Sequence, residues 1–248
     1  MGSPCSPFRL NMIYALVPRP YPVVRMGSGR RVTIQGAYAI SHNTWIHRIA
    51  RAAIAKPLVG TKVTPNQLTT ARLATGLAAA AALAVGESPW QHLGGALFVL
   101  SMLLDRADGE LARLTGTTSS WGHAYDLFAD AASDLLIFAG LGVGLRDGAF
   151  GQWAMPLGFL AGAAVVAIYW LVVRIEVLKG ARAAEMPGFF GFDVDDAIVA
   201  VPVAVWLGWS EPLLAAAALG APLFAVFFFF LFWRKLAAAE PEQHGKRP

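Results

Sequence analysis

Long apolar runs separated by short polar connections fill most of the chain after residue 64. Several of these runs are nearly free of charge over about 20 residues, the length that a helix needs to cross the hydrocarbon core of a bilayer. On this basis six spans are predicted, at residues 65–86, 90–113, 121–145, 153–178, 194–210 and 212–234. The pattern therefore predicts an all-α integral membrane protein with six transmembrane helices.

Composition and the placement of charge support this reading and orient the chain. Hydrophobic residues make up 56% of the sequence and charged residues only 15%, which is less charge than a soluble domain of this size carries. With both termini inside, every one of the 20 lysines and arginines except Arg146 falls on the cytoplasmic side or at an adjoining helix end. Because cytoplasmic loops are enriched in these residues, we expect a multi-pass protein of the cell membrane with both termini in the cytoplasm.

The charge distribution also bears on partners. The net charge of +4 is compatible with nucleic-acid binding, but the basic residues form no stripe interleaved with aromatic residues. We therefore expect membrane lipids around the protein and no nucleic-acid partner. The single cysteine, Cys5, excludes an internal disulfide and a cysteine-based metal cluster.

Four regions are expected along the chain. The first contains no hydrophobic leader and is predicted to be disordered, with Met26 as an alternative start. The expected regions are a cytoplasmic tail at 1–40, an interfacial amphipathic helix at 41–60, the six-helix transmembrane domain at 61–236 and a second cytoplasmic tail at 237–248.

The amphipathic helix precedes the first span. Trp45, Ile46 and Ile49 recur at helical spacing, and basic residues fall mostly on the other side. Such a helix is suited to the headgroup plane of a membrane, although an ordinary helix packed against the bundle is the alternative. The first span then has a clear start, with Thr64 as the predicted N-cap and Pro65 at the first helical position.

Four aspartates mark the inner ends of the second and third spans. Asp105 and Asp108 are three residues apart and Asp126 and Asp130 are four apart, so each pair shares one helix face. A short loop makes the two helices antiparallel neighbours, which brings the four carboxylates to a similar depth. Four anions in an apolar bundle are costly, and divalent cations resolve that conflict. Oxygen ligands favour Mg²⁺ or Mn²⁺ over zinc.

Other residues near these aspartates are suited to the same site. Gly109 and Gly122 leave room for a ligand to approach the backbone, and Ala112 keeps the surface one turn later open. Arg113 is a cation placed to contact a phosphate oxygen. Together they describe a pyrophosphate site that faces the cytoplasm.

The stretch 105–130 resembles the signature of the CDP-alcohol phosphotransferase family, also called CDP-alcohol phosphatidyltransferases. The family pattern is D-x2-D-G-x2-A-R-x8-G-x3-D-x3-D, and every fixed position is present at the right separation. The wider features also resemble the family: six helices, a preceding interfacial helix and a Thr64-Pro65-Asn66 start to the first span. Membership would make this chain a phospholipid-synthesising transferase that releases CMP by direct displacement with two metal ions.

The resemblance implies a role for each matching residue. Asp130 would also be the general base that takes the proton of the acceptor hydroxyl. A homodimer is implied as well. The implied metal ligands for a pair of Mg²⁺ or Mn²⁺ ions are Asp105, Asp108, Asp126 and Asp130, and the implied contacts of the CDP group are Gly109, Ala112, Arg113 and Gly122, with Asn66, Thr69 and Ser119 as weaker ones.

The acceptor stays open at the level of sequence. The family divides into enzymes that join CDP-diacylglycerol to a polar alcohol and enzymes that join CDP-choline or CDP-ethanolamine to a lipid alcohol. We expect the first kind, with CDP-diacylglycerol as donor and a polar alcohol as acceptor, and the second kind is the alternative. Glu110 within the motif resembles the branch that makes inositol-phosphate-type products. The cluster Arg174, Glu176, Lys179 and Arg182 is suited either to an acceptor phosphate or to the positive cytoplasmic side. A membrane prenyltransferase and a cation transporter are the alternatives from other classes.

Overall fold

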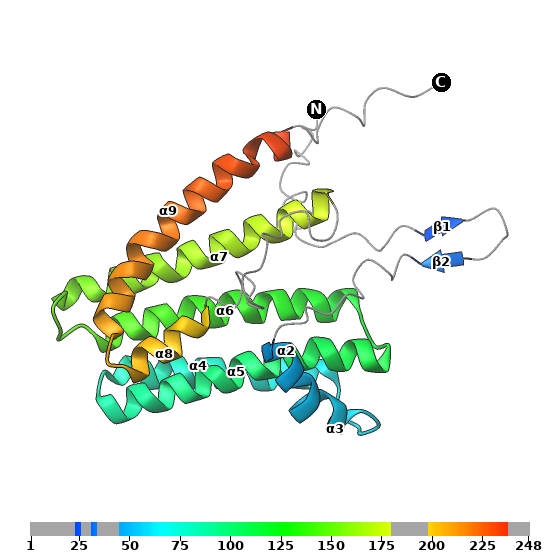
Figure 1. The fold of residues 1–248 in the computed structure, drawn as a ribbon, viewed down its shortest axis with the longest axis horizontal. Coiled ribbons are helices and arrows are strands. Elements are labelled where there is room, and N and C mark those ends of the chain that lie inside the picture. Colours follow the sequence, from blue (N-terminus) through cyan, green and yellow to red (C-terminus); the bar gives the residue numbers. More distant parts are fainter. Residues whose placement is uncertain (1–22, 26–30, 34–44, 180–197, 238–248) are drawn as a thin grey trace, which may run out of the picture.

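The computed structural model describes residues 23–25, 31–33, 45–179 and 198–237 (Figure 1). Within these ranges a short antiparallel pair, β1 (Val23–Arg25) and β2 (Arg31–Thr33), precedes an otherwise helical chain. A short helical segment follows, made of α2 (Trp45–Ala50), the π-helix η2 (Arg51–Ala55) and α3 (Lys56–Leu58). The main body consists of α4 (Pro65–Val85), α5 (Ser88–Thr115), α6 (Ser120–Gly144), the 3₁₀ turn η3 (Gly151–Trp153), α7 (Ala154–Lys179), α8 (Ala200–Trp206) and α9 (Ser210–Ala237).

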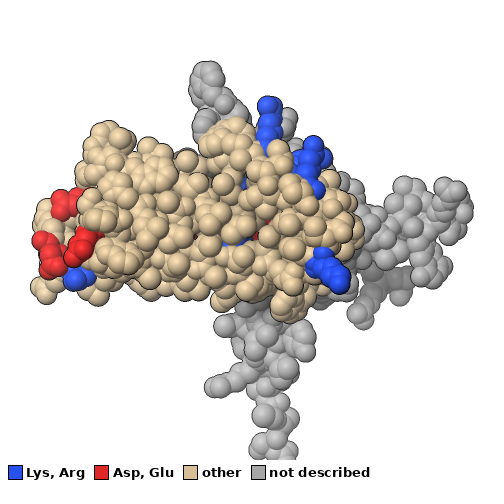
Figure 2. Space-filling view, turned by 90° about the horizontal axis from the view of Figure 1, so that it is seen from below, with Lys and Arg blue, Asp and Glu red and all other residues tan. Residues whose placement is uncertain are grey.

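The helices agree with an integral membrane protein. Four segments are long and apolar enough to cross a membrane, namely Pro65–Val85, Ser120–Gly144, Gly151–Ile175 and Ser210–Trp233. Figure 2 shows charged side chains gathered at the two ends of the molecule, with a nearly uncharged flank between them. A flank of this kind suits a hydrocarbon environment, because a charged side chain at the centre of a bilayer is costly.

The two other predicted spans differ from these four. The span predicted at 90–113 lies within α5, which is 28 residues long but carries the charged motif. The span predicted at 194–210 contains α8, which has only 7 residues, and residues 194–197 lie outside the described part of the chain. Six transmembrane helices therefore stay a prediction, as does the predicted tail at 1–40, of which only the two short strands are described.

The helical segment before α4 packs on the bundle. Ala50 and Ala55 form one buried cluster with Leu68 of α4 and with Ala107 and Leu111 of α5. The opposite side of this segment leaves large apolar side chains exposed, including Trp45 and Ile49. The segment thus has a bundle-facing side, and its predicted position in the headgroup plane stays a prediction.

The start of α4 is capped as predicted. Thr64 has extended backbone, its hydroxyl accepts a hydrogen bond from the Gln67 amide, and the Gln67 side chain accepts one from the Thr64 amide. This reciprocal pair satisfies two amides that a helix end otherwise leaves unpaired. With Pro65 at the first position, the start of α4 is well defined, and this helix packs against both α5 and α6.

Glycines bring α6 close to the helices on either side. A Cβ atom on Gly140 would collide with the backbone carbonyl of Ala80 in α4, and one on Gly144 would collide with that of Leu83. On the other side of α6, a Cβ atom on Gly158 of α7 would collide with the backbone carbonyl of Phe138 in α6. Small residues allow this approach, and the close contact sets the register of α6 against its neighbours.

Replacement of Gly140 by alanine is expected to lower the stability of the fold by about 1–3 kcal/mol, because the new methyl group must push α6 away from α4. The measurement is thermal unfolding of the purified protein in detergent. Gly220→Ala in α9 is the matched control, since nothing lies within 4 Å of its added Cβ. The control is expected to melt at the wild-type temperature or slightly above, and equal losses in both variants would contradict the close packing.

Candidate active site

The α5–α6 hairpin brings the four predicted aspartates to one region. Helix α5 ends at Thr115, Gly116 adopts a left-handed conformation with φ +66°, and α6 begins at Ser120. The connection, residues 116–119, is even shorter than the predicted loop at 114–120, and the two helices run antiparallel. Asp105 and Asp108 project from α5, and Asp126 and Asp130 project from α6.

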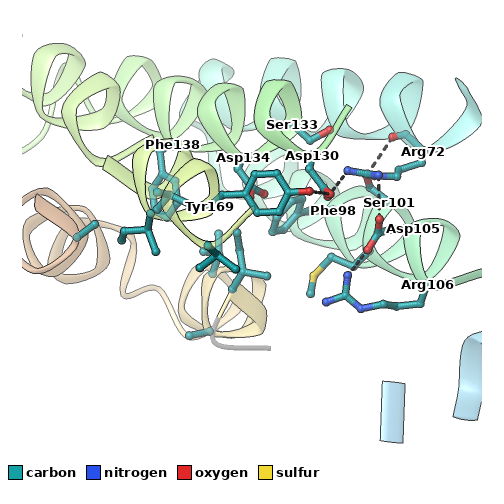
Figure 3. Close-up of a pocket in the computed structure, with 18 of the residues that line it drawn as sticks. Arg72, Phe98, Ser101, Asp105, Arg106, Asp130, Ser133, Asp134, Phe138 and Tyr169 are labelled. Atoms are coloured by element: carbon teal, nitrogen blue, oxygen red, sulfur yellow. Dashed lines mark hydrogen bonds and ion pairs between the residues drawn. The ribbon is translucent and has the colours of Figure 1, made fainter. Parts of the chain in front are cut away.

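A single arginine of α4 lies among these carboxylates. The Nη1 atom of Arg72 is 2.8 Å from an oxygen of Asp105 and 2.7 Å from an oxygen of Asp126, and its Nη2 atom pairs with Asp130. Figure 3 shows the guanidinium of Arg72 between Asp105 and Asp130. The Arg72 side chain is only 3% exposed. One buried cation therefore joins three carboxylates from two different helices.

This arrangement answers the electrostatic conflict expected from the sequence. A buried charge is costly to desolvate, and it is tolerated where opposite charges and hydrogen bonds surround it. The planar guanidinium has several donors in a rigid fork, so it can serve more than one carboxylate at a time. The backbone of Arg72 is also tied to α5, because the Ser101 hydroxyl donates a hydrogen bond to its carbonyl at 3.0 Å.

The fourth carboxylate, Asp108, has a different partner. It is 4% exposed, and one of its oxygens accepts a hydrogen bond from the Thr69 hydroxyl at 2.7 Å. Thr69 is expected from the sequence to be a weak contact of the CDP group. In the structure its hydroxyl is directed at Asp108, so it orients this carboxylate.

Three of the aspartates are close enough to share a metal ion. Asp105, Asp108 and Asp126 each offer an oxygen, and these atoms lie within 4.8 Å of one another. A set of carboxylate oxygens suits a hard divalent cation such as Mg²⁺ or Mn²⁺. Asp130 lies outside this group of three and joins it through Arg72.

These residues form one end of a large cavity. The cavity has a volume of about 680 Å³, and its charged end is lined by the four aspartates, Arg72, Gly109 and Arg113. From there it continues between α6, α7, α8 and α9, where its walls are mostly apolar. Residues of this apolar part include Phe138, Val165, Val201, Leu213 and Phe224. The cavity thus suits a ligand with a charged group and an apolar portion.

The residues predicted to contact the CDP group fall into two sets. Gly109 faces the guanidinium of Arg113, which would lie 3.6 Å from an added Cβ, and both residues line the cavity. Gly122 lies beside Asn66 and Ser119, whose oxygens would each lie 3.0 Å from its added Cβ. The Ser119 hydroxyl accepts the Gly122 amide as the N-cap of α6. Among the described residues that line the cavity, Asn66, Thr69, Ala112, Ser119 and Gly122 do not appear.

Glu110 of the motif links the site to the segment before α4. This carboxylate is 2% exposed and accepts a hydrogen bond from Arg113 at 3.0 Å. It also lies 3.7 Å from the Nε atom of Arg51 in η2. Arg113 is thereby held over the cavity, and the helical segment that precedes α4 contributes to the support of the site.

Three residues that pair with the aspartates, Arg72, Arg106 and Tyr169, are absent from the prediction. Arg106 of α5 pairs with Asp105 and also lines the cavity. Arg72 carries a usable signal, since it is the only lysine or arginine between residues 63 and 105, and a charge inside an apolar span marks a functional position. Tyr169 of α7, whose hydroxyl donates to Asp130 at 2.8 Å, carries no such signal.

The basic cluster at the inner end of α7 is only partly described. Arg174 is exposed and is not among the residues that line the cavity. The side chains of Glu176 and Lys179, and all of Arg182, lie outside the described part of the chain. The predicted choice between an acceptor site and a topology signal therefore stays open.

Comparisons with known proteins agree with the motif. The chain is 31% identical to the "Bifunctional IPC transferase and DIPP synthase" of Rubrobacter xylanophilus over 164 residues, which cover 66% of this chain and 36% of that protein. It is 32% identical to the phosphatidylinositol phosphate synthase of Streptomyces avermitilis over 139 residues, or 49% of this chain and 56% of that one. The chain thus spans only about a third of the first relative and just over half of the second.

Solved structures and family models extend the likeness. The crystal structure of the Mycobacterium tuberculosis phosphatidylinositol phosphate synthase with CDP-DAG bound superposes with a TM-score of 0.54. The match covers 82% of this chain and 98% of that one at 19% identity, so it is evidence for the fold alone. The family model described as CDP-alcohol phosphatidyltransferase matches residues 62–233, which is more than half of the chain and includes the four aspartates, Arg72 and Tyr169. This chain belongs to the CDP-alcohol phosphatidyltransferase family.

Proposed function

We propose that this protein transfers a substituted phosphate group from a CDP-linked alcohol to the hydroxyl of a polar acceptor and releases CMP. The observation that carries the proposal is the meeting of Asp105, Asp108 and Asp126 within 4.8 Å at the charged end of a cavity. In a family of CDP-alcohol phosphatidyltransferases, such a site suits the pyrophosphate of the donor.

In the proposed direct displacement, different residues of the site bind the donor and accept the proton. Arg113, held by Glu110, contacts the pyrophosphate, and Gly109 leaves the surface beside it open. Asp130 accepts the proton of the acceptor hydroxyl. The acceptor oxygen then forms a bond to the β-phosphorus while the bond from that phosphorus to the CMP oxygen breaks, so that CMP leaves with the electron pair.

Two divalent cations, Mg²⁺ or Mn²⁺, are proposed as cofactors. Asp105, Asp108 and Asp126 are suited to hold them by their oxygen chemistry and spacing, with Asp130 as a further ligand. When bound, such ions offset the negative charge that builds on the leaving phosphate. Arg72 supplies positive charge to the same carboxylates from the protein side.

The donor is proposed to be CDP-diacylglycerol and the acceptor a small polar alcohol. The solved relative has CDP-DAG bound, and the relative from Streptomyces avermitilis is named for a phosphatidylinositol phosphate product. Transfer from CDP-choline or CDP-ethanolamine to a lipid alcohol is the second candidate. It draws support from the apolar part of the cavity between α6 and α9, which suits a hydrocarbon chain.

The proposal extends to the membrane topology and the oligomeric state. Six segments are proposed to cross the cell membrane, with α5 and the predicted span 194–210 added to the four apolar helices, and with both termini and the site on the cytoplasmic side. A homodimer is proposed from the family, and the small residues exposed on the helix faces permit close association.

The transferase proposal is tested by CMP release from purified protein supplied with CDP-diacylglycerol, Mg²⁺ or Mn²⁺ and a panel of polar alcohols. The wild type is expected to release CMP with one acceptor and to stop when the metal is chelated. Asp130→Asn is expected to lower the rate by about 100-fold or more, because it removes the general base. Asp147→Asn changes an exposed aspartate at the other end of the bundle and is expected to leave the rate unchanged. An absence of CMP release with every donor and acceptor refutes the proposal.

Removal of the central cation is expected to make stability depend on divalent metal. Arg72→Met removes the guanidinium that pairs with Asp105, Asp126 and Asp130, of which only Asp105 keeps another guanidinium, that of Arg106, among the described residues. The expected cost is about 3–5 kcal/mol in the presence of a chelator. Added Mg²⁺ is expected to raise the melting temperature of Arg72→Met more than that of the wild type. Arg146→Met, at the opposite end of the bundle, serves as the control, and an equal response to Mg²⁺ in both variants would argue against a metal site at these carboxylates.

A further inference from the structure

Helix α7 contributes one polar side chain to the carboxylate cluster. The Tyr169 hydroxyl donates a hydrogen bond to Oδ2 of Asp130 at 2.8 Å, while Oδ1 of the same carboxylate pairs with Arg72. Figure 3 shows the two partners on either side of Asp130, from different helices. Tyr169 lies outside the 26-residue motif stretch 105–130 that identifies the family, and it also lines the cavity.

We propose that Tyr169 is a positioning residue that fixes the orientation of Asp130 toward the acceptor. The inference rests on the proposed function, in which Asp130 is the general base. An aspartate carboxylate has a broad torsional range about its last bond. Donors on both oxygens, one from α4 and one from α7, restrict that range and hold the carboxylate plane in a single orientation.

The two hydrogen bonds leave the base able to act. An ionised carboxylate offers about four lone-pair positions, and the two donors occupy only two of them. Asp130 lines the cavity together with Asp134 and Tyr169, so it lies within reach of an acceptor bound there. An acceptor hydroxyl in this cavity meets a base that is already oriented, which avoids part of the entropic cost of alignment during the reaction.

Close packing between α6 and α7 sets the length of this hydrogen bond. Added Cβ atoms on Gly142 and Gly158 would collide with the backbone of the opposite helix, and one on Gly162 would lie 2.7 Å from the carbonyl of Leu135. Because the two helices are antiparallel, the successive contacts come closer to the site as α7 proceeds from Gly158 to Gly162. Tyr169 is two turns beyond Gly162 and Asp130 is just over one turn before Leu135, so the glycine contacts place the phenol opposite the carboxylate.

Tyr169→Phe is the direct test, because it removes the hydroxyl and keeps the ring. In the CMP-release assay kcat is expected to fall by about 10- to 100-fold, the range for a hydrogen bond to a charged group. The KM for the CDP-alcohol is expected to stay within about twofold, because the hydroxyl contacts neither the proposed pyrophosphate site nor the three clustered carboxylates. Tyr125→Phe is the matched control, since it also removes a tyrosine hydroxyl that contacts another helix: Tyr125 of α6 lies 3.1 Å from the Thr70 hydroxyl of α4.

Gly162→Ala provides a second test that leaves Tyr169 intact. Its methyl group must move α7 away from Leu135, which lengthens the Tyr169–Asp130 hydrogen bond, so kcat is expected to fall with little change in KM. A Tyr169→Phe protein with wild-type kcat, or one whose lower rate is matched by Tyr125→Phe, overturns the inference. So does a rate loss that comes only with a raised KM and a lower melting temperature. A wild type that releases no CMP refutes the transferase proposal itself, and the inference with it.

Discussion

The pairing of one buried guanidinium with carboxylates from two helices is the interaction on which the rest of the site depends. Arg72 reaches Asp105 on α5 and both Asp126 and Asp130 on α6, and it does so from the interior of α4. Without this cation, Asp105 would keep Arg106 as a partner, but Asp126 and Asp130 would lose their guanidinium contact. The guanidinium therefore lets three helices converge around a cluster of negative charge.

Close backbone contact between helices is the second constraint, and it serves the first. Helix α6 is held against α4 by Gly140 and Gly144 and against α7 by Gly142 and Gly158. Because α6 carries two of the aspartates, its register decides which side chains of α4 and α7 reach them. The glycines at the α4–α6 and α6–α7 contacts thus bring Arg72 and Tyr169 to one carboxylate, that of Asp130, from opposite sides.

The sequence predicts those parts of the site that depend on local geometry. Helical spacing puts Asp105 with Asp108 and Asp126 with Asp130, the short loop makes α5 and α6 antiparallel, and the capping of α4 by Thr64 follows from its residue types. The comparisons confirm the family resemblance. Membership of this family argues against the two alternatives from other classes, a membrane prenyltransferase and a cation transporter.

The parts that the sequence does not predict depend on contacts between distant segments. Tyr169 meets Asp130 across 39 positions of the chain, and the contact follows from helix register that no local pattern encodes. The resemblance implies that Thr69 and Ser119 contact the CDP group, and this stays a prediction. The structure adds contacts that the sequence does not predict: the Thr69 hydroxyl donates to Asp108, and the Ser119 hydroxyl caps α6. Helix α8 has 7 residues, fewer than the predicted span at 194–210. An apolar run indicates how many hydrophobic residues follow one another, but it does not specify where a helix begins and ends.

Direct titration of the purified protein with Mn²⁺, followed by the electron paramagnetic resonance signal of the free ion, tests the central claim that these carboxylates form a divalent-cation site. The wild type is predicted to bind Mn²⁺ with CDP-diacylglycerol present, and Asp108→Asn, which alters a carboxylate that Arg72 does not pair with, is predicted to bind it at least about tenfold more weakly. Equal binding by the two proteins, or no binding by the wild type, would contradict the account.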